Sequence, residues 1–209
     1  MVRVKICGIT NIEDAFAAIS LGADAIGFIF VKESPRRISV EEARKISRAL
    51  PPFVNKVGVF ANEPLESLLT IMAYCSLDTC QLHGEEPPSY CEKLGWATIK
   101  AFRVGNPDED IEKMMESYKG KVSAFLLDTY KPRILGGTGE VFDWRIAREL
   151  RKYGPIIISG GLNPSNVVEA IEIAYPYGVD VSSGVEAWPG KKDWRKMKEF
   201  IERAKNPPW

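Results

Sequence analysis

Two patterns of apolar and polar residues alternate along the chain. Short, nearly continuous apolar runs are each followed by a turn and by a segment whose apolar residues recur at three- and four-residue spacing. The first pattern is typical of buried strands and the second of amphipathic helices. The predicted strands are 2–6, 24–30, 55–60, 78–82, 97–102, 122–127, 155–158 and 178–181. The predicted helices lie near 11–21, 40–49, 64–75, 87–94, 107–118, 143–152, 164–175 and 191–205.

The regular alternation of strand and helix predicts a parallel sheet covered by helices. An open, doubly wound sheet and a closed (β/α)8 TIM barrel both fit this description. The number of units distinguishes them, because eight strands close a barrel whereas five or six leave open edges. No linker or low-complexity tract divides the sequence. We therefore predict an α/β protein with a single (β/α)8 TIM barrel domain over residues 1–209.

Local signals support the positions of the helices. Thr10 with Glu13, and Ser39 with Glu42, have the spacing of a capping box. The dipeptide Asn163-Pro164 has the order typical of a helix start, with a capping amide before a proline. We expect helices to begin at these three places.

The charge balance limits the partners of the chain. With 28 basic and 28 acidic residues, no global positive field attracts nucleic acid, so an anion must be held by a local site. The longest apolar run, 23–31, contains Asp24 and is far too short to span a membrane. The N-terminal residues do not resemble a signal peptide. We expect a cytoplasmic protein that binds neither nucleic acid nor membranes and is a monomer or a homodimer.

The four cysteines and the single histidine predict no metal site. Cys7, Cys75, Cys80 and Cys91 form no C-x-x-C pair, and His83 alone does not complete a common zinc ligand set. Cys75 and Cys80 lie on or beside apolar segments, where a buried free thiol is expected. Free thiols are typical of a reducing compartment, which agrees with a cytoplasmic location.

Two groups that can move a proton end two of the predicted strands. Cys7 follows strand 2–6, and Asp128 follows the apolar run 124–127. In a barrel the C-terminal ends of the strands surround one cavity, where catalytic residues collect. A thiolate can accept a proton and a carboxylic acid can donate one. The residues alone leave two other interpretations open: Cys7 as a small apolar core residue, and Asp128 as a loop cap or the partner of a lysine.

Glycine-rich turns follow the last two predicted strands. The first contains Gly160 and Gly161, and the second is Ser182-Ser183-Gly184. In this fold such turns hold phosphate through backbone N–H groups and the positive end of a helix dipole. The two turns together predict a small phosphorylated substrate. A further run, Gly136–Gly139, is either a plain turn or a loop that closes over a ligand.

Arg36 and His83 also follow predicted strands. Arg36 could bind a carboxylate through paired N–H donors, but next to Arg37 it could equally belong to the solvated surface. His83 could contact the substrate, although a lone histidine more often has a structural role. The residues alone do not decide between these interpretations.

Taken together, these segments resemble the phosphoribosylanthranilate isomerases, which are (β/α)8 enzymes of tryptophan biosynthesis. The resemblance extends from the first predicted strand to the eighth, and it depends on the order and placement of the motifs. The matching segments are Lys5–Thr10, Gly22–Phe28, Ser34–Ile38, Gln81–Glu85, Leu127-Asp128, Gly136–Gly139 with Phe142–Trp144, Ser159–Leu162 and Asp180–Glu186.

The resemblance implies an Amadori rearrangement of N-(5-phosphoribosyl)anthranilate to 1-(2-carboxyphenylamino)-1-deoxyribulose 5-phosphate, without a metal or cofactor. It makes Asp128 the general acid toward the furanose ring oxygen and Cys7 the general base that removes the proton from C2. It assigns the anthranilate carboxylate to Arg36 and the phosphate to the two glycine-rich turns. His83 and Asp180 match family positions near the mouth of the barrel, but the resemblance assigns neither of them a step.

The proposed base needs help from its surroundings. A thiol with its ordinary pKa of about 8.5 is a poor base at neutral pH. We expect Lys5 to point outward from the barrel. We therefore expect positive potential from Arg36 or from helix N-termini to lower the pKa of Cys7.

Two other functions fit parts of the sequence. The sugar-phosphate isomerase of the histidine pathway resembles this chain in reaction and phosphate binding, but it has an aspartate where this chain has Cys7. A barrel that only binds a phosphorylated ligand should lack the acid or the base. Both Cys7 and Asp128 are present, which favours the phosphoribosylanthranilate isomerases.

Overall fold

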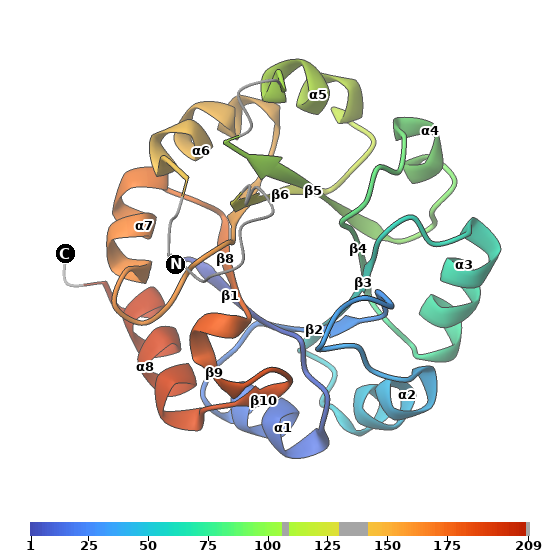
Figure 1. Ribbon diagram of the computed structural model, residues 1–209, viewed down its shortest axis with the longest axis vertical. Helices are drawn as coiled ribbons and strands as arrows, with labels where there is room; N and C mark the ends of the chain where they lie inside the picture. The colour runs from blue at the N-terminus through green and yellow to red at the C-terminus, as the bar shows by residue number, and fades with distance from the viewer. Residues whose placement is uncertain (106–108, 130–141, 208–209) are drawn as a thin grey trace.

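The computed structural model describes residues 1–105, 109–129 and 142–207, and their strands form a barrel inside a ring of helices (Figure 1). The barrel strands are β1 (Arg3–Cys7), β2 (Ala25–Ile29), β3 (Asn55–Phe60), β4 (Thr79–Leu82), β5 (Ala97–Val104), β6 (Ala124–Thr129), β7 (Ile156–Ile158) and β8 (Gly178–Val181). The helices are α1 (Ile12–Ser20), α2 (Val40–Ala49), α3 (Leu65–Tyr74), α4 (Pro88–Cys91), α5 (Ile111–Tyr118), α6 (Trp144–Leu150), α7 (Val167–Ala174) and α8 (Trp194–Lys205). Two short 3-10 helices, η1 (Arg151–Tyr153) and η2 (Ser183–Val185), and a hairpin of β9 (Glu186–Trp188) and β10 (Lys191–Lys192) are also present.

The barrel closes where β1 pairs with β8. The strands follow one another from β1 to β8, each parallel to its neighbours, and residues 3–6 of β1 pair with residues 178–181 of β8. Because a closed parallel sheet has no edge, the C-terminal ends of all its strands surround one mouth. The prediction of a closed (β/α)8 barrel, rather than an open sheet, is confirmed.

Buried apolar side chains form two clusters on opposite sides of the strands. The larger lies between strands and helices and includes Val4 and Ile6 of β1. The smaller consists of Ile99, Ala101, Ala124, Leu126 and Ile157. Its members alternate along their strands with members of the larger cluster, so they fill the barrel interior. By the same alternation, Lys5 and Cys7 of β1 point into the barrel.

The predicted helix starts are partly confirmed. The hydroxyl of Ser39 accepts a hydrogen bond of 3.2 Å from the N–H of Glu42 and caps α2, as predicted. The prediction that Thr10 caps the first helix is wrong. Asn11 caps α1, since its side-chain oxygen accepts from the N–H of Asp14 at 2.9 Å. The hydroxyl of Thr10 donates instead to a backbone carbonyl between β9 and β10.

Three other predicted helix limits differ from the structure. α7 begins at Val167 rather than at residue 164, because the side chain of Asn163 accepts from the N–H of Ser165 and holds a separate turn before the helix. α4 is a single turn of four residues. α8 begins three residues after the predicted start at 191, because Lys191–Lys192 forms β10.

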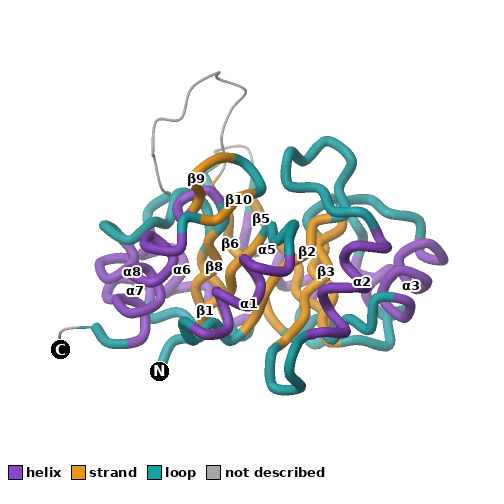
Figure 2. Tube along the Cα trace, turned by 90° about the horizontal axis from the view of Figure 1, so that it is seen from below, coloured by secondary structure: helices purple, strands orange, loops and turns teal. Residues whose placement is uncertain are grey.

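The hairpin of β9 and β10 lies at one end of the barrel, and the N-terminus lies at the opposite end (Figure 2). The hairpin directly follows β8 and η2, so it stands at the mouth formed by the C-terminal ends of the strands. Within the ranges that the structure describes, each helix is too short or too polar to cross a membrane.

Candidate active site

Six of the predicted site residues meet around one cavity at the C-terminal ends of β5 to β8. The cavity has a volume of about 430 Å³, and its predicted lining residues are Asp128, Gly160, Gly161, Asp180, Ser182 and Ser183. The rest of the lining consists of Arg103, Thr129, Ser159, Leu162 and Val181. Gly184 follows directly and packs against the carbonyl oxygen of Leu162, where no side chain would fit. Residues separated by more than 50 positions in the sequence thus face the same space.

Cys7 ends β1 and is buried beside Gly27 of β2. A Cβ atom on Gly27 would lie 2.8 Å from the sulfur of Cys7, so only glycine leaves room for this thiol. The side chain of Lys5 points into the barrel on the same side, and its Nζ donates hydrogen bonds of 2.9 Å to Asp180 Oδ1 and to Gln81 Oε1. The expectation that Lys5 points outward is therefore wrong, because residues two apart on a strand share a face.

The surroundings of Cys7 act on its pKa in opposite directions. Burial raises the pKa of the Cys7 thiol, the ammonium groups of Lys5 and Lys192 lower it in part, and the carboxylate of Asp180 raises it. The net result is a raised pKa, so the protonated thiol predominates at neutral pH. The expected lowering by Arg36 is wrong. The nearby cations are Lys5 and Lys192, whose Nζ donates to the backbone carbonyl of Cys7 at 2.6 Å.

Both carboxylate oxygens of Asp128 have a polar neighbour. Oδ1 accepts from the N–H of Thr129 at 2.8 Å, and Oδ2 lies 3.3 Å from Nε2 of His83. The other ring nitrogen of His83 lies 3.2 Å from Nε2 of Gln81. Because the ammonium of Lys5 can only donate, the oxygen of the Gln81 amide faces Lys5 and its NH₂ group faces His83. Nδ1 of His83 is therefore the acceptor, so the ring proton is on Nε2, the nitrogen that lies 3.3 Å from Oδ2 of Asp128.

The first glycine-rich turn fits closely against the candidate acid. Gly160 has a left-handed backbone with φ of +76°, and a Cβ atom there would lie 2.5 Å from Oδ1 of Asp128. Its carbonyl accepts from the hydroxyl of Thr129 at 3.2 Å. A glycine at position 160 is therefore required for this geometry.

In the second turn, the hydroxyl oxygen of Ser182 is buried next to Gly8 and has no hydrogen-bond partner among the described residues.

Arg36 lies next to the cavity rather than in its lining. Its Nε lies 2.9 Å and 3.0 Å from the two carboxylate oxygens of Glu186, and its Nη2 donates to one of them at 2.7 Å. Nζ of Lys192 donates to the same carboxylate at 2.9 Å. Burial would raise the pKa of Glu186, but Arg36 and Lys192 outweigh it and lower the pKa. The interpretation of Arg36 as a freely solvated residue is wrong, because its side chain is 20% exposed and its Nε and Nη2 donate to Glu186.

Arg103 is a site residue that the sequence analysis missed. It lies on β5 opposite Asp128 in the pairing of β5 with β6, and it lines the cavity. Within the described ranges, no hydrogen bond or ion pair engages its guanidinium. Its position two residues after Ala101, and four after Ile99, was a usable signal, because both of these point into the barrel.

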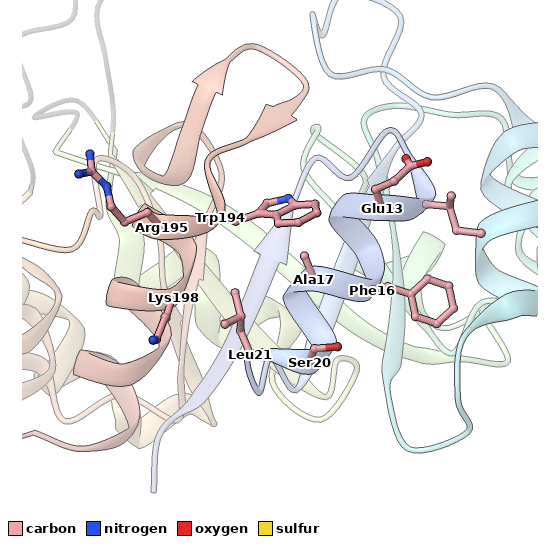
Figure 3. Close-up of a pocket in the computed structure, with 9 residues that line it drawn as sticks. Glu13, Phe16, Ala17, Ser20, Leu21, Trp194, Arg195 and Lys198 are labelled. Carbon is pink, nitrogen blue, oxygen red and sulfur yellow. The ribbon is translucent and has the colours of Figure 1, made fainter.

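Three other features are not among the described lining residues of this cavity. The predicted ligand-closing run Gly136–Gly139 lies outside the described residues. Within 1–105, 109–129 and 142–207, no three His, Cys, Asp or Glu residues are grouped so that they could hold a metal ion. A mostly apolar groove of about 910 Å³ lies on the outside of the barrel between α1 and α8, with Phe16 and Trp194 among its lining (Figure 3). None of the predicted site residues is among its lining.

The sequence and the fold both match one family. The family described as N-(5'phosphoribosyl)anthranilate (PRA) isomerase matches residues 4–203. The chain belongs to this family. The N-(5'-phosphoribosyl)anthranilate isomerase of Geobacter metallireducens is 50% identical over 205 residues, which are 98% of this chain and 100% of that protein.

Solved structures of N-(5'-phosphoribosyl)anthranilate isomerases agree with the family assignment. The crystal structure of the enzyme from Thermotoga maritima has a TM-score of 0.90 and 50% identity, and the match covers 98% of this chain and 99% of that one. Another isomerase structure, in complex with reduced 1-(o-carboxyphenylamino)-1-deoxyribulose 5-phosphate, has a TM-score of 0.87 and 48% identity, with the same coverage. The resemblance stated from the sequence is confirmed, and the chain is an isomerase of tryptophan biosynthesis rather than one of the two alternatives.

Proposed function

We propose that this isomerase converts N-(5-phosphoribosyl)anthranilate to 1-(2-carboxyphenylamino)-1-deoxyribulose 5-phosphate with Asp128 as general acid and Cys7 as general base. The observation that carries the proposal is the cavity of about 430 Å³, because Asp128 and both glycine-rich turns line it. Cys7 lies beside Lys5, and the ammonium of Lys5 donates to Asp180, which lines the same cavity. A related isomerase structure contains a reduced form of this product, which supports the assignment of the ligand.

In the first step Asp128 donates its proton to the furanose ring oxygen. The bond between that oxygen and C1 breaks, and the lone pair of the anthranilate nitrogen forms a C1=N double bond. The ring opens to a Schiff base with a neutral hydroxyl as the leaving group. Nε2–H of His83 stabilises the carboxylate that remains on Asp128, because it lies 3.3 Å from Oδ2.

In the second step Cys7 removes the proton from C2. The electrons of the C2–H bond form a C1=C2 double bond, and the electrons of C1=N return to nitrogen, which gives an enolamine. The enolamine then takes up a proton at C1 while the hydroxyl on C2 loses its proton, so that the C2–O bond becomes the ketone carbonyl. Because the pKa of Cys7 is raised, only a small fraction of the protein carries the thiolate. That thiolate is a stronger base than one with an ordinary pKa. Acid and base thus act one after the other on the same sugar.

Anchors at both ends of the substrate orient the sugar between these groups. The turns with Gly160-Gly161 and Ser182-Ser183-Gly184 line or adjoin the cavity and hold the phosphate through backbone N–H groups. Arg36 holds the anthranilate carboxylate with the N–H groups that Glu186 leaves free. Arg103 adds a positive charge to the wall of the phosphate end.

The remaining properties concern the whole chain. We propose that residues 1–209 act as one barrel domain and that the enzyme works in the cytoplasm, where the buried free thiols Cys7, Cys75, Cys80 and Cys91 stay reduced. One structure is described as monomers generated from a dimeric phosphoribosylanthranilate isomerase of Thermotoga maritima. Its 46% identity to this chain supports a homodimer over a monomer. Sedimentation equilibrium distinguishes these two states directly.

Turnover of the substrate tests the proposed reaction. N-(5-phosphoribosyl)anthranilate is generated from anthranilate and phosphoribosyl pyrophosphate, divalent metals are then removed by a chelator, and the loss of anthranilate-type fluorescence is followed. Rapid loss with the wild-type protein, absent with a Cys7→Ala/Asp128→Asn double variant, supports the proposal. Equal loss rates with and without wild-type protein would contradict it.

A further inference from the structure

Lys5 is a charged residue inside the barrel that no step of the reaction uses. Its side chain is 6% exposed, as is that of its ion-pair partner Asp180. Burying an ammonium group is costly unless it is paired and hydrogen-bonded, and an apolar residue would fill the same space at lower cost. An ion pair retained at this depth, with Asp180 in the wall of the cavity, therefore calls for a role beyond packing.

The Lys5 ammonium has two hydrogen-bond acceptors and has Cys7 as a neighbour. It donates hydrogen bonds of 2.9 Å to Asp180 Oδ1 and to Gln81 Oε1. The side chains of Lys5 and Cys7 lie side by side, since Cε of Lys5 and the sulfur of Cys7 are 3.1 Å and 2.8 Å from where a Cβ atom on Gly27 would be. At this proximity the ammonium of Lys5 lowers the pKa of Cys7, and the thiolate of Cys7 raises the pKa of Lys5.

Through Gln81 the same ammonium also reaches the acid. Lys5 can only donate, so it fixes the side-chain oxygen of Gln81 toward itself and turns the NH₂ group toward Nδ1 of His83. His83 is thereby held as the Nε2–H tautomer, and that N–H faces Oδ2 of Asp128 at 3.3 Å. Hydrogen bonds therefore lead from Lys5 through Gln81 to His83, and the other ring nitrogen of His83 lies 3.3 Å from Asp128.

We propose that Lys5 is a positioning residue for both proton-transfer groups: its buried ammonium stabilises the thiolate of Cys7 and, through Gln81 and His83, orients a donor onto Asp128. This inference rests on the proposed function for its catalytic meaning. Burial would lower the pKa of Lys5, but Asp180 and Cys7 outweigh burial and raise it, so the ammonium stays charged across the working pH range.

The charged groups around Cys7 predict opposite effects for two substitutions. Lys5 on β1 and Lys192 on β10 favour the thiolate, whereas Asp180 on β8 disfavours it. Glu186 on β9 offsets Lys192, to which it is paired, and Arg36 is paired to Glu186 in turn. Lys5→Met should therefore raise the pKa of Cys7 and reduce the thiolate fraction by about tenfold, and Asp180→Asn should lower the pKa.

Two measurements that do not depend on turnover test the proposal. The ultraviolet absorbance of the thiolate is titrated in wild type, Lys5→Met and Asp180→Asn, each with a matched Cys7→Ser variant whose titration is subtracted. The nitrogen-15 NMR signals of His83, the single histidine of the chain, report its tautomer in the same variants. Lys5→Arg, which keeps the charge, is the conservative control.

The expected results are specific to Lys5. Lys5→Met raises the pKa of Cys7 and makes the Nδ1–H tautomer of His83 visible, and Lys5→Arg keeps the wild-type pKa. If Lys5→Met does not fold, the double variant Lys5→Met/Asp180→Asn replaces it, because it leaves no unpaired buried charge. The pKa of Cys7 should be higher in this double variant than in Asp180→Asn. An unchanged pKa of Cys7 together with an unchanged tautomer would overturn the proposal.

The rate profile separates this proposal from the assignment of the base. In Lys5→Met, the rise of kcat with pH should move upward together with the pKa of Cys7, whereas a merely structural defect would lower kcat equally at every pH. A shifted pKa of Cys7 with an unshifted rate profile would support the contact between Lys5 and Cys7 and contradict the role of Cys7 as base.

Discussion

Arg36 and Glu186, which are 150 positions apart in the sequence, form a two-pronged ion pair at the mouth of the barrel. The Glu186 side chain is almost fully buried, and Nζ of Lys192 contacts the same carboxylate. This arrangement fixes the direction of the Arg36 guanidinium before any ligand binds. A pre-oriented guanidinium loses little further freedom when it binds a second carboxylate, which suits an anchor for the anthranilate group.

Arg36→Ala should raise KM by about tenfold or more and leave kcat within a few-fold, because a charge-assisted hydrogen bond contributes about 1.5–3 kcal/mol. Steady-state kinetics with the phosphoribosylated substrate measure both constants. Arg37→Ala is the matched control, since Arg37 is exposed and adjacent. Equal KM values for the two variants would remove the substrate-binding role of Arg36.

Arg103→Met should weaken competitive inhibition by inorganic phosphate by about tenfold, because the guanidinium faces the cavity and pairs with no described residue. Inhibition constants for phosphate and for anthranilate are measured in parallel, and the anthranilate constant should stay unchanged. Arg195→Met, on the outer groove of Figure 3, is the matched control. A phosphate constant that matches wild type would place Arg103 outside the phosphate subsite.

The pH dependence of kcat should follow the raised pKa of Cys7. Burial raises the pKa of this thiol, so the thiolate fraction and the rate keep increasing with pH beyond the ordinary thiol value of about 8.5. Cys7→Asp carries a carboxylate that ionises at much lower pH, so its remaining activity should not rise with pH in the alkaline range. A wild-type profile that levels off near neutrality would contradict the account of Cys7.

Asp14 should contribute stability that depends on pH. Its side chain is fully buried, and it accepts hydrogen bonds of 2.8 Å from Lys191 Nζ and from Trp194 Nε1. Burial raises the pKa of Asp14, but these donors outweigh burial and lower it. The stabilisation is therefore complete above the unfolded-state pKa of about 3.9 and is lost as the pH falls through the lower folded-state pKa.

Asp14→Ala should lower the free energy of unfolding by about 3 kcal/mol at neutral pH, because it leaves a half-buried lysine without its partner. Urea denaturation at neutral and at acidic pH measures this difference, which should shrink at the acidic end. Glu13→Ala, on the exposed side of the same helix turn, is the control. A constant difference between wild type and Asp14→Ala at all pH values would argue against the carboxylate as the cause.

The barrel was predictable because eight apolar runs alternate with helical segments, and each run formed a strand in the expected order. The same period of two should have predicted the direction of Lys5. If Cys7 faces the barrel interior, the residue two positions earlier faces it as well. The general tendency of lysine to be exposed outweighed this geometric argument, and the error concealed the link from Lys5 to Gln81.

Contacts between distant segments were not predictable from one sequence. Nothing in the region around Arg36 indicates a partner at position 186, and the hairpin of β9 and β10 that carries Glu186 reads as part of a loop and a helix. The start of α1 differed by one residue because Thr10 and Asn11 are both good caps and the packing decides between them. Order along the chain was predictable, but side-chain pairing across the barrel was not.

The most direct test of the central claim compares catalysis and binding in Cys7→Ala and Asp128→Asn. Each variant should lower kcat by at least about 10²-fold, the low end for the loss of a general acid or base. Affinity for reduced 1-(o-carboxyphenylamino)-1-deoxyribulose 5-phosphate, measured by calorimetry, should stay within a few-fold of wild type, because the anchors lie elsewhere. Turnover close to wild type in either variant, with the ligand still bound, would contradict the role proposed for that residue.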